Sequence, residues 1–442
     1  MVSSRQRRVA ARTSGSSFDT AVIVRLILYT ACLLVSLFFW RDTRSSFLIP
    51  KAVIAINLAI IGASVWLVLW SYGFLKLPHT KLTSPLFALL GVFLLSIPGC
   101  VSLPDAMEAL SRVFAYVALF YLTVSVIRKG EQVRLIYLLL VFAGTAASCL
   151  AIMEYHGIRV WDWSEKVGRL SIISTFGNPN YLAGFLVAVI PLGLSMVLHK
   201  IKGFLLQPLN TGCLIMLSCV VITQTRGSWL ALAVAIPALV ILMLQSAVGQ
   251  WFREHIGPLL AFMLIGFVLL TAVVVIFGPG ELSVDRLFSG HNIIQRFLVW
   301  QVTLNMVRDY PLFGVGLGNF KVHYMQYQAD FLEDPANKRY IPFNGKAVQS
   351  HNDYLQLLAE TGLLGVLVLG WVLWRLMRIF LPLLSVQSPA GDETFYLAGA
   401  AASLIGVATH AVVSFPLHLP ATSLVVCLVA GIAAGWGSRI FL

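Results

Sequence analysis

The feature that most constrains this chain is a succession of long apolar segments separated by short polar ones. Twelve such segments can be marked, and most are long enough to cross the roughly 30 Å hydrocarbon core of a bilayer as a helix. Helices are expected because lipid offers no hydrogen-bond partner to exposed backbone groups. The sequence therefore predicts an all-α polytopic membrane protein with about 12 transmembrane helices. Their approximate bounds are 22–40, 52–71, 84–103, 106–126, 133–154, 180–198, 210–224, 227–245, 256–277, 363–381, 394–414 and 419–441.

The composition argues against an ordinary soluble protein. Of the 442 residues, 58% are hydrophobic and only 11% are charged, and the mean hydropathy is +0.85. Soluble domains carry about 25% charged residues. In a soluble protein the net charge of +12 would suggest nucleic acid, but in a membrane protein the positions of the cations report orientation. We therefore expect no nucleic-acid partner.

The placement of lysine and arginine predicts which loops face the cytoplasm. With the N-terminus inside, most cations of the short connections fall on the cytoplasmic side, from Arg5 and Arg8 at the start to Arg439 near the end. The main exceptions are Arg41, Arg44 and Lys51. The positive-inside rule then predicts that both termini are cytoplasmic and that the number of spans is even.

One connection is far longer than the others, and this orientation places it outside. It divides the chain into an N-terminal membrane region of about nine helices (1–277), the loop itself (278–362) and a C-terminal region of three helices (363–442). Its aromatic and apolar residues indicate an ordered segment. Within it, NIIQRFLVWQVTLNMVRD reads as an amphipathic helix, which the proline and glycines of YPLFGVGLGNF would end.

Two arginines are candidates for binding an anion near the outer face. Arg226 lies where two apolar runs meet, and an arginine in or near hydrocarbon costs roughly 2.5–3.5 kcal/mol on insertion scales. Arg296 lies in the predicted amphipathic helix, four residues before Trp300. The plainer interpretations are a side chain that snorkels to the interface for Arg226 and a solvated helix face for Arg296. Alternatively, two converging guanidiniums would suit a lipid diphosphate, because each presents a planar fork to phosphate oxygens.

The polar segment QSHNDYLQLLAETG, residues 349–362, contains a candidate general base, His351. Ser350 and Asp353 have the spacing of a capping box, which places His351 in the first turn of a helix running to Gly362. A helix N-terminus disfavours a protonated imidazole, so His351 would stay neutral, as a base must. The alternative is a histidine that satisfies a loop hydrogen bond. Supporting candidates in the same motif are Asn352, Asp353 and Tyr354.

A second polar stretch, STFGNPNYLAGF at residues 174–185, precedes the sixth apolar run. Its simplest interpretation is a turn followed by the start of a helix. The amide of Asn178 is also a supporting candidate, because it could line a sugar site. The acidic residues and histidines match no reliable pattern of metal ligands, so we expect neither a metal nor a cofactor.

The segments TQTRGSWLAL, QRFLVWQVTLNMVRDYPLFGVGLGNF and SHNDYLQLLAETGLLG, in this order, resemble the O-antigen ligase and O-antigen polymerase superfamily. The resemblance is strong from about residue 170 to 375. It implies a membrane glycosyltransferase of the GT-C type in the bacterial inner membrane, which takes a glycan from undecaprenyl diphosphate on the periplasmic face. By position, Arg226 and Arg296 match the family's arginines that hold the donor diphosphate. His351 matches the histidine that activates the acceptor hydroxyl, and the family needs neither metal nor nucleotide.

The resemblance does not separate ligase from polymerase. The leading hypothesis is a ligase that transfers the glycan to lipid A-core by a single displacement, inverting the anomeric carbon. A polymerase would instead use a second lipid-linked glycan as acceptor, and a protein acceptor is a related alternative. The alternative from another class is a lipid-linked sugar transporter, although the two halves of the chain show no convincing repeat.

Overall fold

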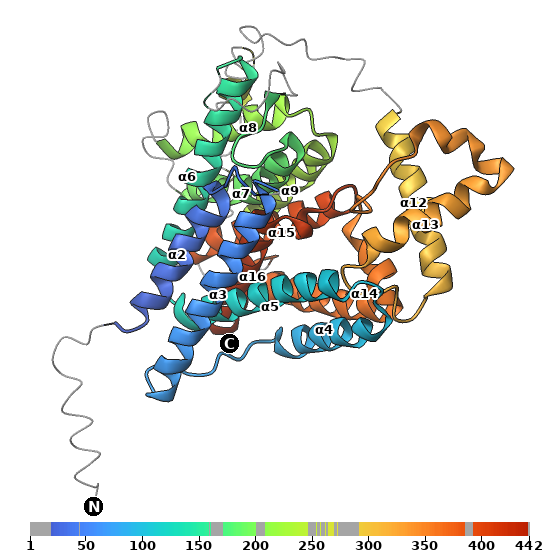
Figure 1. Ribbon diagram of the computed structural model, residues 1–442. Helices are drawn as coiled ribbons and strands as arrows, with labels where there is room; N and C mark the ends of the chain where they lie inside the picture. Colours follow the sequence, from blue (N-terminus) through green and yellow to red (C-terminus); the bar gives the residue numbers. More distant parts are fainter. Residues whose placement is uncertain are drawn as a thin grey trace, which may run out of the picture.

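The computed structural model describes residues 19–43, 45–158, 160, 171–199, 208–245, 291–384 and 392–440, together with a few residues between 253 and 272. Over these residues the chain forms α-helices and short 3-10 helices and contains no β-strand (Figure 1). The predicted all-α class is confirmed.

Eleven of the twelve predicted apolar segments coincide with a helix, and the remaining one, 256–277, lies mostly outside the described residues. In the N-terminal part the helices are α2 (Val22–Leu37), α3 (Leu48–Ser71), α4 (Thr83–Ser96), α5 (Leu103–Val126), α6 (Gly130–Tyr155), α7 (Pro179–His199), α8 (Pro208–Ile222) and α9 (Arg226–Gln245). In the C-terminal part they are α14 (Asp353–Phe380), α15 (Asp392–Ala411) and α16 (Pro420–Ile440).

The lengths of these helices fit a bilayer. Among the described residues, seven helices are long and apolar enough to cross a membrane, and four shorter ones are apolar as well. The longer helices are α3, α5, α6, α7, α9, α14 and α15, and the shorter ones are α2, α4, α8 and α16. The chain is therefore a multi-pass membrane protein.

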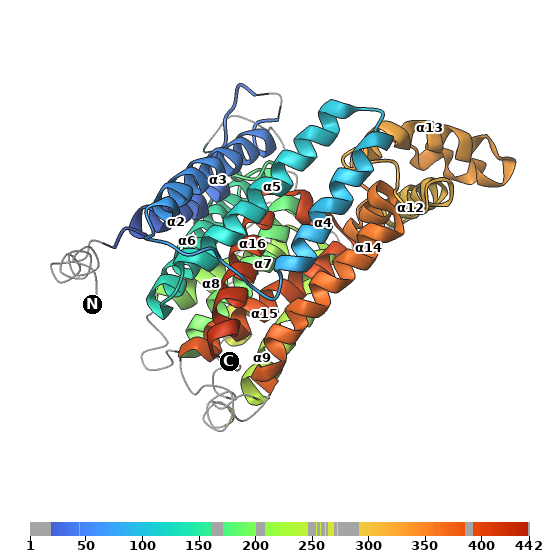
Figure 2. The ribbon, with the colours of Figure 1, turned by 90° about the horizontal axis from the view of Figure 1, so that it is seen from below.

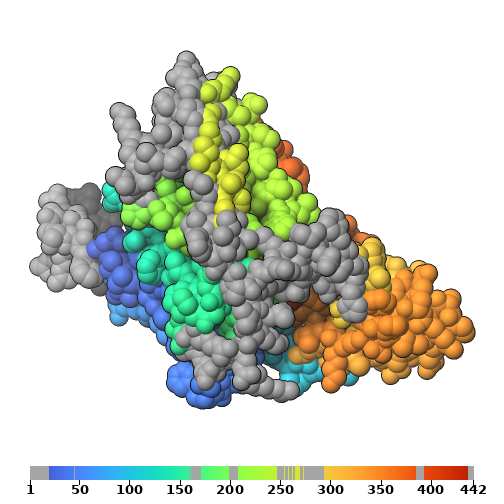
Figure 3. Space-filling view, turned by 90° about the horizontal axis from the view of Figure 1, so that it is seen from above, coloured from blue at the N-terminus to red at the C-terminus, as the bar shows by residue number. Residues whose placement is uncertain are grey.

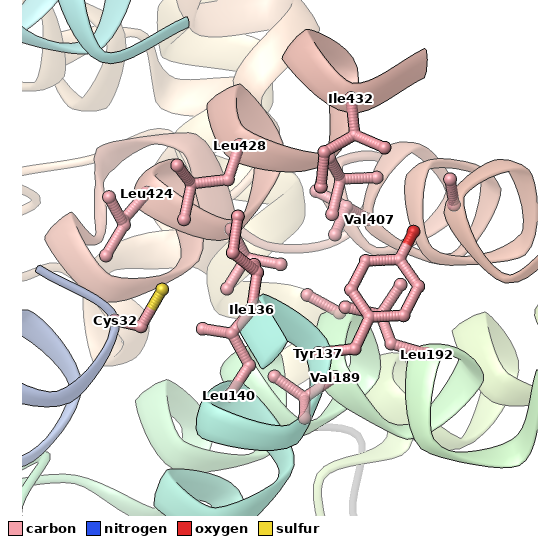
Figure 4. Close-up of a cluster of buried hydrophobic side chains, with 14 of the residues drawn as sticks. Cys32, Ile136, Tyr137, Leu140, Val189, Leu192, Val407, Leu424, Leu428 and Ile432 are labelled. Atoms are coloured by element: carbon pink, nitrogen blue, oxygen red, sulfur yellow. The ribbon is translucent and has the colours of Figure 1, made fainter. Parts of the chain in front are cut away.

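Helix α7 lies at the centre of the helical body. Its membrane-spanning window is 94% buried inside the protein, whereas the window of α3 is only 22% buried. Helix α15 packs against α7 and α9, and α6 packs against α2, α7 and α8. The core where they meet is apolar and includes Ile136, Tyr137 and Leu428 (Figure 4). The hydroxyl of Tyr137 donates to the carbonyl of Tyr396 at 3.0 Å, so its polar atom is satisfied within the core.

Two further helices project from the side of this body. They are α12 (His291–Asp309) and α13 (Phe320–Glu333), followed by the 3-10 segment η4 (Pro335–Phe343). Figures 1 and 3 show them extending away from the membrane helices. The predicted amphipathic helix is α12, whose buried face includes Leu298 and Val302 and shares a small core with Phe320 and Tyr324 of α13. The structure confirms that this segment is a helix, although apolar side chains such as Ile293 and Phe297 are also exposed on it.

The turn between α12 and α13 is bound to α14 through the main chain. Helix α14, which lies beside α4 in Figure 2, is broken at Gly362, where φ is 66° and ψ is −166°. The break leaves carbonyls of the preceding turn without helical partners. The N–H of Val315 donates to the carbonyl of Ala359 at 2.8 Å, and the N–H of Gly316 donates to that of Glu360 at 3.0 Å. The projecting helices are thereby fixed to the membrane body.

Gly362→Ala should destabilise the protein. A Cβ at this position would lie 2.2 Å from the carbonyl carbon of Leu312, in a left-handed backbone that alone costs about 1–3 kcal/mol for other residues. We expect the free energy of unfolding to fall by at least about 3 kcal/mol in all, measured by thermal unfolding in detergent.

Gly370→Ala on the same helix is the matched control. No atom lies within 4 Å of its added Cβ, and alanine favours a helix by about 1 kcal/mol over glycine. Its melting temperature should therefore stay level or rise. Similar melting of the two variants would contradict the close contact at Gly362.

Candidate functional site

Several helix ends meet around one large cavity. Its volume is about 1210 Å³, somewhat above the usual range of about 300–1,000 Å³ for small-molecule sites. Residues at the starts of α7, α9, α14 and α16 and at the end of α15 line it, so these ends lie on the same side of the helical body. Part of α12 closes the cavity from the projecting unit.

All three principal residues predicted from the sequence line this cavity. Arg226 is the first residue of α9, Arg296 lies in the second turn of α12, and His351 immediately precedes Asn352, the cap of α14. Burial, and then the charge of Arg226, lower the pKa of Arg296. The two guanidiniums are therefore close enough to repel each other, as side chains that share one anion would be.

The imidazole of His351 is neutral near physiological pH. Burial, and then the charge of Arg296, lower its pKa to about 4. The ring packs edge-on against Phe415, with centroids 5.0 Å apart. An uncharged proton acceptor thus lies within the electrostatic reach of a cation.

The predicted capping box is wrong, and with it the position of His351. Helix α14 begins at Asp353, and its cap is Asn352, whose side chain accepts a first-turn N–H at 3.0 Å. The hydroxyl of Ser350 instead donates to the carbonyl of Asn352 at 2.6 Å. His351 therefore precedes the helix, in a left-handed conformation with φ of 56°. Its neutrality follows from burial and a neighbouring arginine, not from the helix dipole.

The segment that carries His351 is held on both sides. The indole N–H of Trp300 donates to the carbonyl of Ser350 at 3.0 Å. The side-chain oxygen of Gln356 accepts the N–H of Ser350, also at 3.0 Å. Because α12 supplies the indole and α14 supplies the amide, both elements position the imidazole.

The sequence analysis missed the partner of Asp353. One carboxylate oxygen lies 2.7 Å from Nδ1 of His418, and the other accepts the N–H of Leu417 at 2.9 Å. Nε2 of His418 lies 3.2 Å from the side-chain nitrogen of Gln356, which also donates to Glu360 at 3.0 Å. Burial opposes protonation of His418, but the charge of Asp353 outweighs it and raises the pKa. No local signal could reveal this pair, because 65 residues separate its members.

The other supporting candidates have separate positions. Asn178 and Tyr354 line the cavity, whereas Asn352 acts as the cap of α14. The hydroxyl of Tyr354 donates to the carbonyl of Ala408 at 2.9 Å, which joins α14 to α15. A further residue of the wall, His410, is fully buried, with Nε2 3.4 Å from the hydroxyl of Ser228. The sequence analysis had not connected His410 with the site.

The acidic residues of the cavity wall already have partners. Lys321 lies 2.8 Å from Asp105, and Arg112 lies 3.5 Å from Glu108. Glu360 accepts the N–H of Gly318 at 2.9 Å in addition to its bond from the glutamine amide. Asp105 and Glu108 are therefore paired with cations of the wall, whereas Glu360 is held by neutral donors. The part of the cavity beside the two arginines is therefore suited to an anionic ligand.

Fold and cavity together define a multi-pass membrane protein with a cationic site where several helix ends meet. Residues 211–370 match the family model described as O-antigen ligase, and this match supports the resemblance to the O-antigen ligase superfamily. The segment includes Arg226, Arg296 and His351. No curated protein matches the chain. At the level of the family, the match supports a membrane glycosyltransferase of the ligase or polymerase type.

Asp353→Ala should destabilise the protein, because it leaves His418 and the N–H of Leu417 without their acceptor. We expect a loss of about 2–4 kcal/mol in the free energy of unfolding, measured by thermal unfolding. Asp353→Asn keeps one acceptor oxygen and should lose less.

Asp330→Ala is the control for this prediction. Its exposed carboxylate accepts one bond from Gln326 at 2.8 Å on the surface of α13. We expect a change within about 0.5 kcal/mol. A loss in Asp353→Ala no larger than in Asp330→Ala would show that the network contributes nothing.

Proposed function

We propose that the protein transfers a glycan from undecaprenyl diphosphate to an acceptor hydroxyl on the periplasmic face of the bacterial inner membrane. The acceptor that we propose is lipid A-core, as for an O-antigen ligase. The observation that carries this is the placement of Arg226, Arg296 and His351 on one cavity. The description of the matched family and the positive-inside orientation support the ligase role and the periplasmic side.

The two arginines bind the donor diphosphate. Negative charge grows on the diphosphate as its bond to the sugar breaks, and fixed cations in a partly buried cavity stabilise that charge more than water does. The guanidiniums of Arg226 and Arg296 repel each other in the free protein. A bound anion relieves this repulsion, which adds to donor affinity.

His351 supplies the base. The acceptor hydroxyl gives its proton to the uncharged imidazole while its oxygen attacks the anomeric carbon of the first sugar. The bond from that carbon to the diphosphate oxygen breaks, and its electron pair leaves with the diphosphate. A single displacement inverts the anomeric carbon and forms no glycosyl-enzyme.

Donor binding also strengthens this base. Arg296 contributes to the low pKa of His351 in the free protein. A diphosphate bound beside them offsets the field of the guanidinium and raises the imidazole pKa towards its ordinary value of 6.5. The acceptor is therefore activated most effectively once the donor is in place.

The test of this function is the mass of the product. Purified protein in nanodiscs, given an undecaprenyl diphosphate-linked glycan and lipid A-core, should yield lipid A-core extended by the glycan. Elongation of the donor glycan in the absence of lipid A-core would instead identify a polymerase. Movement of the labelled donor across liposomes with no new glycosidic bond would identify a transporter.

Substitution of the three residues separates their roles in this assay. His351→Ala should lower kcat by about 10²–10⁴-fold while donor affinity is kept, because only the base is lost. Arg226→Ala and Arg296→Ala should each lower kcat by about 10²–10³-fold and weaken donor binding. Arg339→Ala is the matched control, because this arginine lies outside the cavity and over the ring of Tyr340. Unchanged turnover of His351→Ala would refute the proposed base.

The pH dependence of transfer should differ between kcat/KM and kcat. Protonation of His351 removes the base, so both parameters fall as the pH is lowered through its pKa. For kcat/KM, which reports the free protein, the fall should occur near pH 4. For kcat, which reports the donor complex, it should occur at higher pH because the diphosphate raises the pKa. A fall of kcat/KM centred near 6.5 would contradict this account.

A further inference from the structure

We propose that the sugar bonded to the donor diphosphate binds beside Arg226, against the rings of Tyr181 and Phe415 and within reach of the amides of Asn178 and Gln224. We call these four residues the sugar subsite. The inference rests on the proposed function and names the groups that recognise the donor's first sugar. All four side chains line the cavity.

The apolar side of the subsite consists of aromatic rings that pack edge to face and reach His351, with planes at 76° for Tyr181 and Phe415 and at 66° for Phe415 and His351. The ring centroids of Tyr181 and Phe415 are 5.7 Å apart, and those of Phe415 and His351 are 5.0 Å apart. The C–H bonds on one face of a pyranose carry slight positive charge, which is attracted to the negative face of an aromatic ring. A sugar stacked on Phe415 lies next to His351, where an acceptor must be deprotonated.

The amide of Gln224 is close to the diphosphate site. Only Thr225 lies between it and Arg226, so the Cα atoms of Gln224 and Arg226 lie within about 7 Å of each other, which is comparable to the width of a sugar ring. Gln224 lines the cavity, and its side chain has no hydrogen-bond partner among the described residues. Its backbone is left-handed, with φ of 50°, a conformation that non-glycine residues rarely adopt.

The amide of Asn178 faces the same region from the start of α7. Its oxygen accepts the N–H of Asn180 at 2.8 Å, whereas its NH₂ group has no partner among the described residues. The hydroxyl of Thr225 donates to the side-chain oxygen of Asn180 at 3.0 Å, which ties the turn before α9 to the start of α7. Amides both donate and accept hydrogen bonds, as sugar hydroxyls do.

Backbone strain is concentrated around this subsite. Among the described residues, the non-glycine residues with positive φ are Ser174, Gln224 and His351. Each lies in a segment that leads into the cavity wall. Such strain persists only where the surroundings enforce it, and it gathers at functional sites.

The surroundings of Ser174 show how the strain is enforced. The buried carboxylate of Glu154 accepts the N–H groups of Ile173 and Ser174 at 2.8 and 2.7 Å. The ammonium of Lys51 lies 4.4 Å from the centre of the Phe176 ring. The loop is fixed before any ligand binds, so the amide of Asn178 is preorganised.

The test compares binding of lipids with and without a sugar. The probes are undecaprenyl diphosphate and its derivatives carrying one hexose, one 6-deoxyhexose or one N-acetylhexosamine, bound to the full chain in nanodiscs. The wild-type protein should bind at least one derivative about tenfold tighter than the bare lipid. Gln224→Gly, which keeps the left-handed backbone, and Phe415→Leu, which keeps an apolar side chain, should each reduce that ratio about fivefold. Both should leave the affinity for undecaprenyl diphosphate within about twofold.

Three controls separate the subsite from its alternatives. Gln224→Ala should lose the same selectivity as Gln224→Gly. A loss in the alanine variant alone would show that backbone strain causes the effect, and would overturn the role of the amide. Phe87→Leu, on the exposed surface of α4, should change nothing. Arg296→Ala should weaken every probe alike. Equal affinity of the wild-type protein for lipids with and without a sugar would overturn the subsite alone, and so would variants that keep the wild-type preference. Failure of the wild-type protein to bind any of the lipids would also overturn the proposed function.

Discussion

The main-chain contact between the α12–α13 turn and the break in α14 is the interaction on which the rest of the site depends. The carbonyls that the break at Gly362 leaves without helical partners are buried, and buried carbonyls need donors from the protein itself. The turn supplies them from Val315 and Gly316. The same contact anchors α12 and so brings Arg296 to a cavity otherwise built from the ends of membrane helices.

The charged side chains of the cavity determine which ligand it suits. The guanidiniums of Arg226 and Arg296 and the uncharged imidazole of His351 lie close together where water screens charge poorly. The charge of Arg226 therefore helps to lower the pKa of Arg296, and the charge of Arg296 helps to lower the pKa of His351. The acidic residues of the wall do not cancel this effect, because bonds such as Lys321 to Asp105 already compensate them. The free site is electrostatically unfavourable, and an anion is the group that relieves it.

Much of the fold could be predicted from the sequence, because an apolar run in lipid has few structural choices. A helix around Arg296 was predicted correctly, and the motifs around Arg226 and His351 singled out residues that share one cavity. The cap of α14 was misplaced because Ser350 and Asn352 are both good capping residues and only the fold decides between them. The pair of Asp353 with His418 and the left-handed backbone of Gln224 leave no local trace in the sequence.

The loop before α7 is held by a buried carboxylate of α6, Glu154, which accepts its N–H groups at Ile173 and Ser174. The hydrogen bonds that hold this loop therefore do not involve Arg226, Arg296 or His351. In the proposed reaction, substitutions in this loop change which sugars the cavity accepts and leave Arg226, Arg296 and His351 in place.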